Sequence, residues 1–424
     1  MRAKKLSIRL AVLLAILAGC WFVTSTHAVA QRAQEKVLHS FPDPNGTGPN
    51  AGVIFDAAGN LYGTTYDSRG GFGTVFELTP LGNGLWTETT LHRFSHNDGY
   101  WPSGVLVFDA SGNLYGTTLE GGTGSGTGCS LRRAGCGTVF ELSPAAGGGW
   151  AETLLLSFDQ IDGAAPYAGL IFDGLGNLYG TTSTGGSDST RASGTVFELS
   201  PTTGGVWTET VLHTFGYNEG SRDGLEPHGG LIFDAVGNLY GTTVGGGTEG
   251  DGTVFELSPH ASGGWAETVL FNFNGENGSS PYSTLIFDAA GNLYGTTQTG
   301  GTLGGGTVFE LSPAAGGDWT ETVLFNFSNQ ESRYVAAGSL IFDAAGNLYG
   351  ALDGGSGNCD AGCGSIFKLS NSAGVWTETG LFFFDGEDGF HPNASLIFDA
   401  SGNLYGTTSF GGAQEDGTVF EIVP

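Results

Sequence analysis

The chain has 424 residues and an acidic composition, with 42 Asp and Glu residues against 14 Lys and Arg residues. A surface with this excess of negative charge repels phosphate backbones, which excludes nucleic acid as an expected partner. Gly accounts for 77 residues, but these recur at fixed offsets beside aromatic residues, which make up 12% of the chain. The composition therefore indicates a packed repeat protein rather than a low-complexity chain.

Residues 1–30 have the features of an export signal. Four basic residues precede an apolar run over 10–23, and Ala28-Val29-Ala30 offers a cleavage site between small residues. The run is short for a membrane span, so we expect none after signal removal. We expect export to the periplasm or the extracellular space. Leu17-Ala18-Gly19-Cys20 also resembles a bacterial lipobox, and an outer-membrane lipoprotein lipidated at Cys20 is the alternative.

A repeat fills the rest of the chain. Its centre is Gly-Asn-Leu-Tyr-Gly, and the Asn recurs at intervals of 53 to 64 residues, at Asn60, Asn113, Asn177, Asn238, Asn292, Asn347 and Asn403. A period of this length is typical of arrays whose units bury their hydrophobic faces against one another. We therefore expect a single domain over residues 31–424.

Each unit contains four short β segments, rich in β-branched and aromatic residues and separated by turn residues. In the third copy they are expected at 170–173, 177–182, 195–200 and 207–215. Alternation predicts that the fourth segment places four side chains on one face: Trp207, Glu209, Val211 and Phe215. Four antiparallel strands per unit are typical of a propeller blade, so the sequence predicts an all-β, seven-bladed β-propeller.

Two repeated Phe positions are predicted to fill the core between the blades; in the first copy they are Phe55 and Phe76. The repeated Asp and Glu residues are interpreted as solvated strand faces and turn caps. Weak binding of divalent cations by these acidic residues is the alternative.

The two ends of the domain complement each other. Residues 35–41 align with the fourth strand at 209–215, whereas the chain ends in a third strand at 418–424 that has no fourth. We expect the N-terminal segment to pair with Thr418–Val423 and close the seventh blade. This pairing removes an open sheet edge that would otherwise invite aggregation.

Two sets of loops are expected on one face of the ring. Loops from a fourth strand to the next first strand contain Asp/Asn-Gly-x-x-Pro, with the prolines at Pro49, Pro102, Pro166, Pro227, Pro281 and Pro392. They share this face with the Gly-rich loops between second and third strands. Two of the Gly-rich loops hold cysteine pairs, Cys129/Cys136 and Cys359/Cys363, which we interpret as local disulfides in an exported chain. Zinc binding by these cysteines is the alternative.

The sixth copy departs from the pattern, with Arg333, Ala336, Ala351-Leu352-Asp353, Lys368 and Asn371 at positions where the other copies agree. Both sequence drift and a site built by breaking the symmetry are consistent with this departure.

Gly-Asn-Leu-Tyr-Gly-Thr-Thr, followed by Gly-Gly and Gly-Thr-Val-Phe-Glu-Leu, resembles the GloVer tandem repeat of exported bacterial "choice-of-anchor" proteins, over about residues 33–424. The blade pattern is also similar to NHL-type propeller repeats. The resemblance implies an exported propeller-like protein and supplies no catalytic residues. Many members resemble one another in ending with a C-terminal sorting anchor, whereas this sequence ends at Pro424, so we expect any anchor at Cys20.

Aromatic residues cluster beside the repeated proline position. We predict that they surround the mouth of the central channel: Trp101, Tyr167, His228, Tyr282, Tyr334 and Phe390. Planar rings above an acidic channel suit stacking on sugars or organic cations. Packing of the loops onto the blades is the alternative role for these rings.

The sequence favours a binding or scaffold module for an extracellular glycan or cell-surface component, monomeric and without cofactor or metal. His96, His228 and His391 lie in the loops of this face at different offsets, and no Gly-x-Ser-x-Gly or His-Glu-x-x-His motif is present. A secreted propeller enzyme that acts on a polysaccharide or a lactone is the alternative. Convergence of unlike polar groups at one point of the mouth would favour that enzyme.

Overall fold

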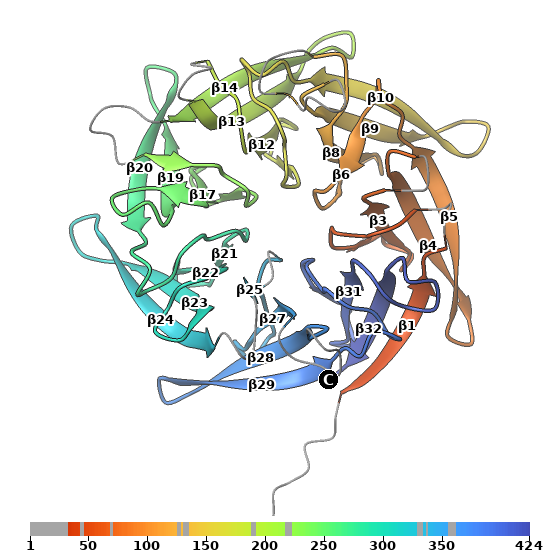
Figure 1. Ribbon diagram of the computed structural model, residues 1–424. Helices are drawn as coiled ribbons and strands as arrows, with labels where there is room; N and C mark the ends of the chain where they lie inside the picture. The colour runs from red at the N-terminus through yellow and green to blue at the C-terminus, as the bar shows by residue number, and fades with distance from the viewer. Residues whose placement is uncertain are drawn as a thin grey trace, which may run out of the picture. The chain divides into compact units, whose positions relative to one another are not determined.

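The computed structural model describes residues 33–42, 46–67, 71–124, 129, 135–187, 192–216, 223–328, 334–335, 338–354 and 362–424. The compact unit from Ala33 to Pro424 is a ring of seven antiparallel sheets, which confirms the predicted seven-bladed β-propeller (Figure 1). The predicted export signal, including Cys20, lies outside the described residues. No helix in the described ranges is long and apolar enough to cross a membrane.

Each blade has four strands ordered from the centre of the ring outward (Figure 1). The first strands have two residues each: β2 (Ile54–Phe55), β7 (Val107–Phe108), β11 (Ile171–Phe172), β16 (Ile232–Phe233), β21 (Ile286–Phe287), β26 (Ile341–Phe342) and β30 (Ile397–Phe398). The second strands are β3 (Leu61–Thr65), β8 (Leu114–Glu120), β12 (Leu178–Thr182), β17 (Leu239–Thr243), β22 (Leu293–Thr297), β27 (Leu348–Asp353) and β31 (Leu404–Thr408).

The third strands are β4 (Thr74–Gly82), β9 (Thr138–Pro144), β13 (Ala192–Pro201), β19 (Thr253–Pro259), β23 (Gly304–Pro313), β28 (Ser365–Ser372) and β32 (Thr418–Val423). The outer strands are β5 (Leu85–Arg93), β10 (Trp150–Ser157), β14 (Trp207–Gly216), β20 (Trp265–Asn272), β24 (Trp319–Ser328), β29 (Val375–Phe383) and β1 (Gln34–Ser40). Four short strands lie in the loops: β6 (Tyr100–Pro102), β15 (Gly224–Leu225), β18 (Gly245–Gly246) and β25 (Tyr334–Val335).

The first strand is shorter than predicted because its Asp builds the turn that follows. In the third blade, Asp173 Oδ1 accepts hydrogen bonds from the backbone N–H groups of Leu175 and Asn177, and Oδ2 accepts one from the Asn177 side chain. The hydroxyl of Tyr179 also donates to Oδ2, at 3.3 Å. The Asn and Tyr bonds to this Asp recur in all seven blades. The repeated Asp is therefore a turn cap, as interpreted from the sequence.

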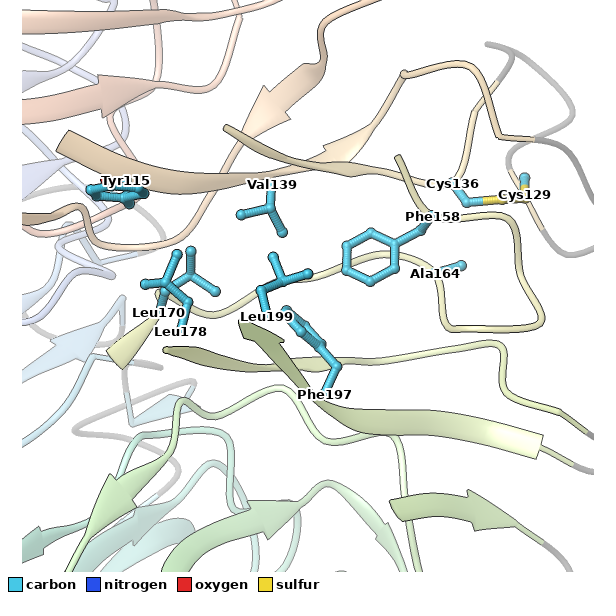
Figure 2. Close-up of a cluster of buried hydrophobic side chains, with 10 residues drawn as sticks. All are labelled: Tyr115, Cys129, Cys136, Val139, Phe158, Ala164, Leu170, Leu178, Phe197 and Leu199. Atoms are coloured by element: carbon cyan, nitrogen blue, oxygen red, sulfur yellow. A yellow bond between two sulfur atoms is a disulfide. The ribbon is translucent and has the colours of Figure 1, made fainter. Parts of the chain in front are cut away.

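The core consists of clusters that lie between neighbouring blades. In the cluster of Figure 2, Tyr115 and Val139 of the second blade meet Leu178, Phe197 and Leu199 of the third. The third-strand Phe, represented by Phe197, is fully buried, as predicted, whereas the first-strand Phe is only half-buried. At roughly 1.5–3 kcal/mol per buried large apolar side chain, seven such clusters stabilise the closed ring.

A third Phe position also belongs to the core. It lies at the end of each outer strand or just beyond it and packs against the third-strand Phe of the next blade, as Phe158 meets Phe197 edge-on at 5.2 Å between ring centroids. Seven such pairs link the seven blades.

The predicted alternation along the outer strand is wrong beyond Glu209. A bulge in the β13–β14 pairing places Phe197 opposite Val211 and Val196 opposite His213. An extra residue reverses the facing of the side chains beyond it. Val211 is therefore exposed, and Leu212 packs against the core instead.

Buried threonine pairs explain the Gly-Thr-Thr and Gly-Thr-Val-Phe motifs. Thr182 Oγ1 lies 2.8 Å from Thr195 Oγ1 on the neighbouring strand, and five further blades have the same contact. The sixth blade has Leu352 and Ser365 at these positions. The sixth blade therefore lacks the threonine pair, and its Leu352 instead belongs to the hydrophobic cluster between the fifth and sixth blades.

The predicted closure of the ring is confirmed. Strand β1 pairs antiparallel with β32, from Gln34 opposite Val423 to Ser40 opposite Thr418 (Figure 1). Phe41 then packs against Phe76 of the first blade, at 4.9 Å between ring centroids. The N-terminal segment therefore completes the seventh blade and also contacts the first.

Candidate functional site in the central pocket

The residue before the repeated proline is held between successive blades. Its N–H donates to the backbone near the start of the third strand of one blade, and its C=O accepts from the residue that follows the second strand of the next. The N–H of Glu226, for example, donates to the carbonyl of Ser193, and its carbonyl accepts from the N–H of Val244. At this position the backbone has positive φ at Gly48, Trp101, Ala165, Glu226, Ser280 and His391. Non-glycine residues rarely adopt this conformation, which persists only where the surroundings fix it.

The residue after the proline lies at the centre of the ring, where a cavity of about 340 Å³ opens. This position contributes Asn50, Ser103, Tyr167, His228, Tyr282 and Asn393 to the cavity lining. Small residues follow it and let the blades approach closely. A Cβ added at Gly169 would lie 2.4 Å from the Val105 carbonyl oxygen, and one at Gly338 would lie 2.3 Å from that of Ala394.

Three of the predicted aromatic residues form one wall of this cavity. The ring of His228 lies 4.4 Å from that of Tyr167 and 4.4 Å from that of Tyr282, measured between centroids. Burial lowers the pKa of His228 to about 4, so its imidazole is neutral at physiological pH. Burial, together with the phenol of Tyr167 and the carboxylate of Glu226, raises the pKa of Tyr282 to about 12. The wall is therefore uncharged, and we call it the aromatic wall.

The other predicted aromatic residues do not join this wall. Trp101 is not among the residues that line the cavity. It stacks on Tyr66, a residue that does line it, with ring centroids 4.8 Å apart and planes 11° from parallel. Phe390 stacks on the exposed Phe410, at 5.4 Å and 21°. Tyr334 lies in β25, but its side chain is outside the described part of the chain.

Polar side chains from the first, fifth, sixth and seventh blades complete the cavity. Gln298 follows the second strand of the fifth blade, Asp353 ends the second strand of the sixth, and Asn50 and Asn393 follow the repeated prolines. Asp353 Oδ1 is paired with His391 Nδ1. In the sequence Asp353 is recognisable only as a departure from the repeat. The signal that could have identified it is a carboxylate at a position occupied by uncharged residues in the other blades.

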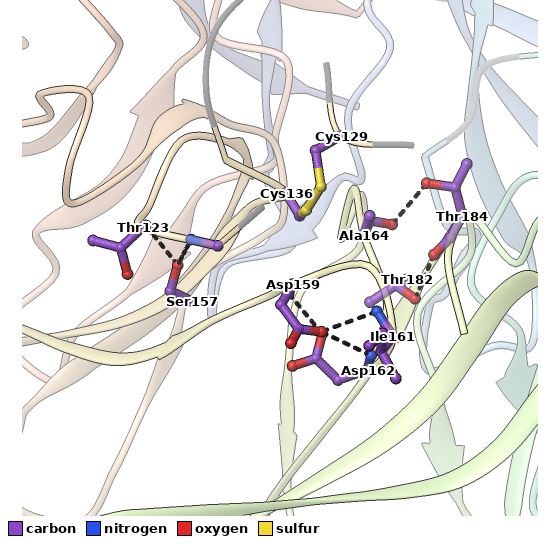
Figure 3. Close-up of a disulfide and its surroundings, with 11 residues drawn as sticks. Thr123, Cys129, Cys136, Ser157, Asp159, Ile161, Asp162, Ala164, Thr182 and Thr184 are labelled. Atoms are coloured by element: carbon purple, nitrogen blue, oxygen red, sulfur yellow. Dashed lines mark hydrogen bonds between the residues drawn. A yellow bond between two sulfur atoms is a disulfide. The ribbon is translucent and has the colours of Figure 1, made fainter. Parts of the chain in front are cut away.

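A second cavity, of about 380 Å³, lies beside the first and shares Tyr167 and His228 with it. Glu120, Glu226 and the disulfide between Cys129 and Cys136 also line it. Figure 3 shows this predicted disulfide beside the loop that leads into the third blade. Cys363 is disulfide-bonded as well, although its predicted partner, Cys359, lies outside the described residues.

Two further histidines among the described residues pair with aspartates of the loops. His92 and His213 contact the loop aspartates Asp98 and Asp223 at 3.3 and 3.4 Å, near the outer strands. Across the described part of the chain, no three His, Cys, Asp or Glu residues are placed to hold a metal ion.

The fold and its axial pocket define a seven-bladed propeller with a ligand-sized opening on one face. The chain belongs to the Gloeobacter/Verrucomicrobia repeat family, whose model matches residues 25–232 and 237–424. This match confirms the resemblance derived from the repeated motifs. No curated protein matches the sequence.

Solved structures with similar folds include enzymes that act on sugars. A polysaccharide lyase of the ulvan lyase type is 13% identical, with 91% of this chain and 95% of that chain covered and a TM-score of 0.54. Its complex with a GlcA–Rha3S unit is 14% identical at the same coverage, with a TM-score of 0.52. A gluconolactonase from Xanthomonas campestris is 14% identical over 94% of this chain and 92% of that chain, with a TM-score of 0.42. At these identities the likeness is one of fold alone.

Proposed function

We propose that the protein is an exported binding module whose central pocket binds carbohydrate. The observation that carries this proposal is the aromatic wall of Tyr167, His228 and Tyr282 over a cavity of about 340 Å³. A cavity of this size, with aromatic rings and a few convergent polar groups, is typical of small-ligand sites. The C–H faces of a sugar ring stack on aromatic rings, while its hydroxyl groups need donors and acceptors at the edges.

The polar residues of the pocket supply those donors and acceptors. Asn50, Gln298 and Asn393 each carry an amide that can both donate and accept, and Asp353 offers carboxylate oxygens. A sugar lying on the aromatic wall would therefore meet hydrogen-bonding groups from several blades. This arrangement favours a polyhydroxylated ligand over a purely apolar one.

Two further aromatic stacks support binding of an extended chain rather than a single sugar. Tyr66 and Trp101 lie at the first and second blades, and Phe390 and Phe410 lie at the seventh. All four residues come from loops of the face on which the pocket opens. An oligosaccharide that leaves the pocket in either direction would therefore find another planar surface.

The test is a glycan array with the purified protein, followed by calorimetric titration of the glycans that bind. We expect Tyr167→Ala with Tyr282→Ala to weaken binding roughly tenfold or more, because each aromatic contact is worth about 0.5–1.5 kcal/mol beyond its buried area. Phe383→Ala is the matched control, since Phe383 is an exposed aromatic residue of the outer strand β29. Binding that survives the double substitution would refute the proposal.

A second candidate function is enzymatic cleavage of a carbohydrate in the same pocket, and one observation favours it. Asp353 lines the cavity and is paired with His391, which places a carboxylate and an imidazole together at the mouth. Such a pair can transfer protons to and from a substrate. An assay for new reducing ends or unsaturated uronates, with Asp353→Asn as the comparison, tests it. Turnover by the parent that Asp353→Asn abolishes would establish the enzyme, and intact glycan after prolonged incubation would exclude it.

A further inference from the structure

The second cavity adds carboxylates to the aromatic wall. It shares Tyr167 and His228 with the central pocket, and Glu120 and Glu226 also line it. Glu120 ends β8 of the second blade, whereas Glu226 precedes Pro227 at the entrance to the fourth. Carboxylates from a strand end and from a loop thus line the same cavity as two rings of the aromatic wall.

Both carboxylates lie close enough to the aromatic wall to affect its phenols. Burial, and after it the charge of Glu120, raises the pKa of Tyr167. After burial and the phenol of Tyr167, the charge of Glu226 also raises the pKa of Tyr282. Glu226 is exposed and adopts a positive φ of 58°, a backbone conformation that few non-glycine residues adopt.

Among the described residues that line the two cavities there are acidic groups but no Lys or Arg. Glu120, Glu226 and Asp353 are the charged residues among those that the structure places there. A negatively charged sugar would meet repulsion at this surface, whereas a cation would be attracted both by the carboxylates and by the faces of the aromatic rings.

We infer that the second cavity is a subsite for a protonated amino group, so that the preferred ligand is an oligosaccharide of amino sugars with free amines. This inference rests on the proposed carbohydrate binding and specifies its ligand class. In the bound state the sugar ring lies on the aromatic wall, and its ammonium group faces Glu120 and Glu226. A primary ammonium has three donors, which match carboxylate acceptors on one side of the ring.

The experiment compares two glycans that differ only at nitrogen: an oligosaccharide of glucosamine and its fully N-acetylated counterpart. We expect the parent protein to bind the free amine about tenfold more tightly at low salt, and this preference to shrink as ionic strength rises. Glu120→Gln with Glu226→Gln should abolish the preference while leaving affinity for the N-acetylated glycan within about twofold. Tyr167→Ala with Tyr282→Ala should weaken binding of both glycans.

The outcomes separate the two proposals. Equal affinity for both glycans, or a preference that persists in the double Gln variant, overturns the amino-group subsite and leaves the carbohydrate proposal standing. Binding of neither glycan overturns the subsite, and binding of no glycan on the array overturns the carbohydrate proposal as well. Thermal melts of each variant confirm that a lost preference does not come from unfolding.

Discussion

Val37 of the first strand lies opposite Phe420 of the last strand, in an antiparallel pairing that joins the two ends of the domain. The same sheet therefore contains the earliest and the latest residues of the propeller. Because every other blade takes its four strands from one stretch of sequence, this blade is the one place where the ring can open without breaking the chain.

Removal of residues 31–41 should lower the melting temperature sharply. The deletion takes away β1 and the buried residues Leu38 and Phe41, and it exposes the edge of β32. Phe41→Ala alone should cost about 3–5 kcal/mol, as expected for a buried Phe. Differential scanning calorimetry measures both changes. The exposed Gln34 provides the control, since Gln34→Ala should change stability by less than about 0.5 kcal/mol.

Stability should fall as pH rises through neutrality. Burial, followed by the charges of Asp388 and Asp385, raises the pKa of Glu35 from 4.5 to about 8. The folded state thus binds a proton that the unfolded chain releases. The stabilisation is complete below 4.5 and is lost as pH rises toward about 8. Burial, followed by the charge of the neighbouring Asp162, likewise raises the pKa of Glu209.

Chemical denaturation at a series of pH values tests this titration. Glu35→Gln should be more stable than the parent above about pH 8 and should flatten the pH dependence. Glu387→Gln is a control, because Glu387 is exposed in the loop that follows β29. A stability that rises steadily toward alkaline pH would show that Glu35 is ionised in the folded protein.

Loss of a turn carboxylate should destabilise the blade that contains it. Although partial burial opposes the shift, hydrogen bonds from Asn177, Leu175 and Tyr179 lower the pKa of Asp173. Asp173→Ala leaves these donors without their acceptor and should cost about 1–3 kcal/mol in urea unfolding. Asp318→Ala, at an exposed hairpin turn, should be nearly neutral. Equal losses of stability from the two substitutions would contradict the stabilising role of the hydrogen bonds to Asp173.

Because Glu226 has a positive φ, we expect its replacement by Gly to weaken ligand preference without loss of stability. Gly adopts this conformation without the steric cost that Glu has, so Glu226→Gly should leave the unfolding free energy unchanged or raise it by up to about 1 kcal/mol. The same substitution removes a carboxylate from the second cavity and should reduce the preference for amino sugars. A marked loss of stability would show that the Glu226 side chain supports the fold.

Most of the fold could be predicted because each repeated residue has one structural task. The spacing of Asn177 from Asp173 specifies a turn, and the match of residues 35–41 to 209–215 specifies the closure. The bulge at Val211 could not be predicted, since the residues around it still alternate as in a regular strand. The facing of a side chain beyond such a bulge depends on strand pairing, which sequence alone does not give.

The site was predicted in part for a similar reason. Tyr167, His228 and Tyr282 directly follow the repeated proline, and the ring brings that position to the centre. Trp101 directly precedes its proline, and the left-handed backbone there turns it onto Tyr66 instead. Asp353 could not be assigned to the pocket in advance, because it ends strand β27, and that strand end meets the proline loops only in the folded ring.

A crystal structure of the protein with a bound amino-sugar oligosaccharide tests the account most directly. We predict a sugar ring stacked on Tyr167 or Tyr282, with its amino group toward Glu120 and Glu226. Sugar bound only at the outer strands or on the opposite face, with the central pocket empty, would contradict it.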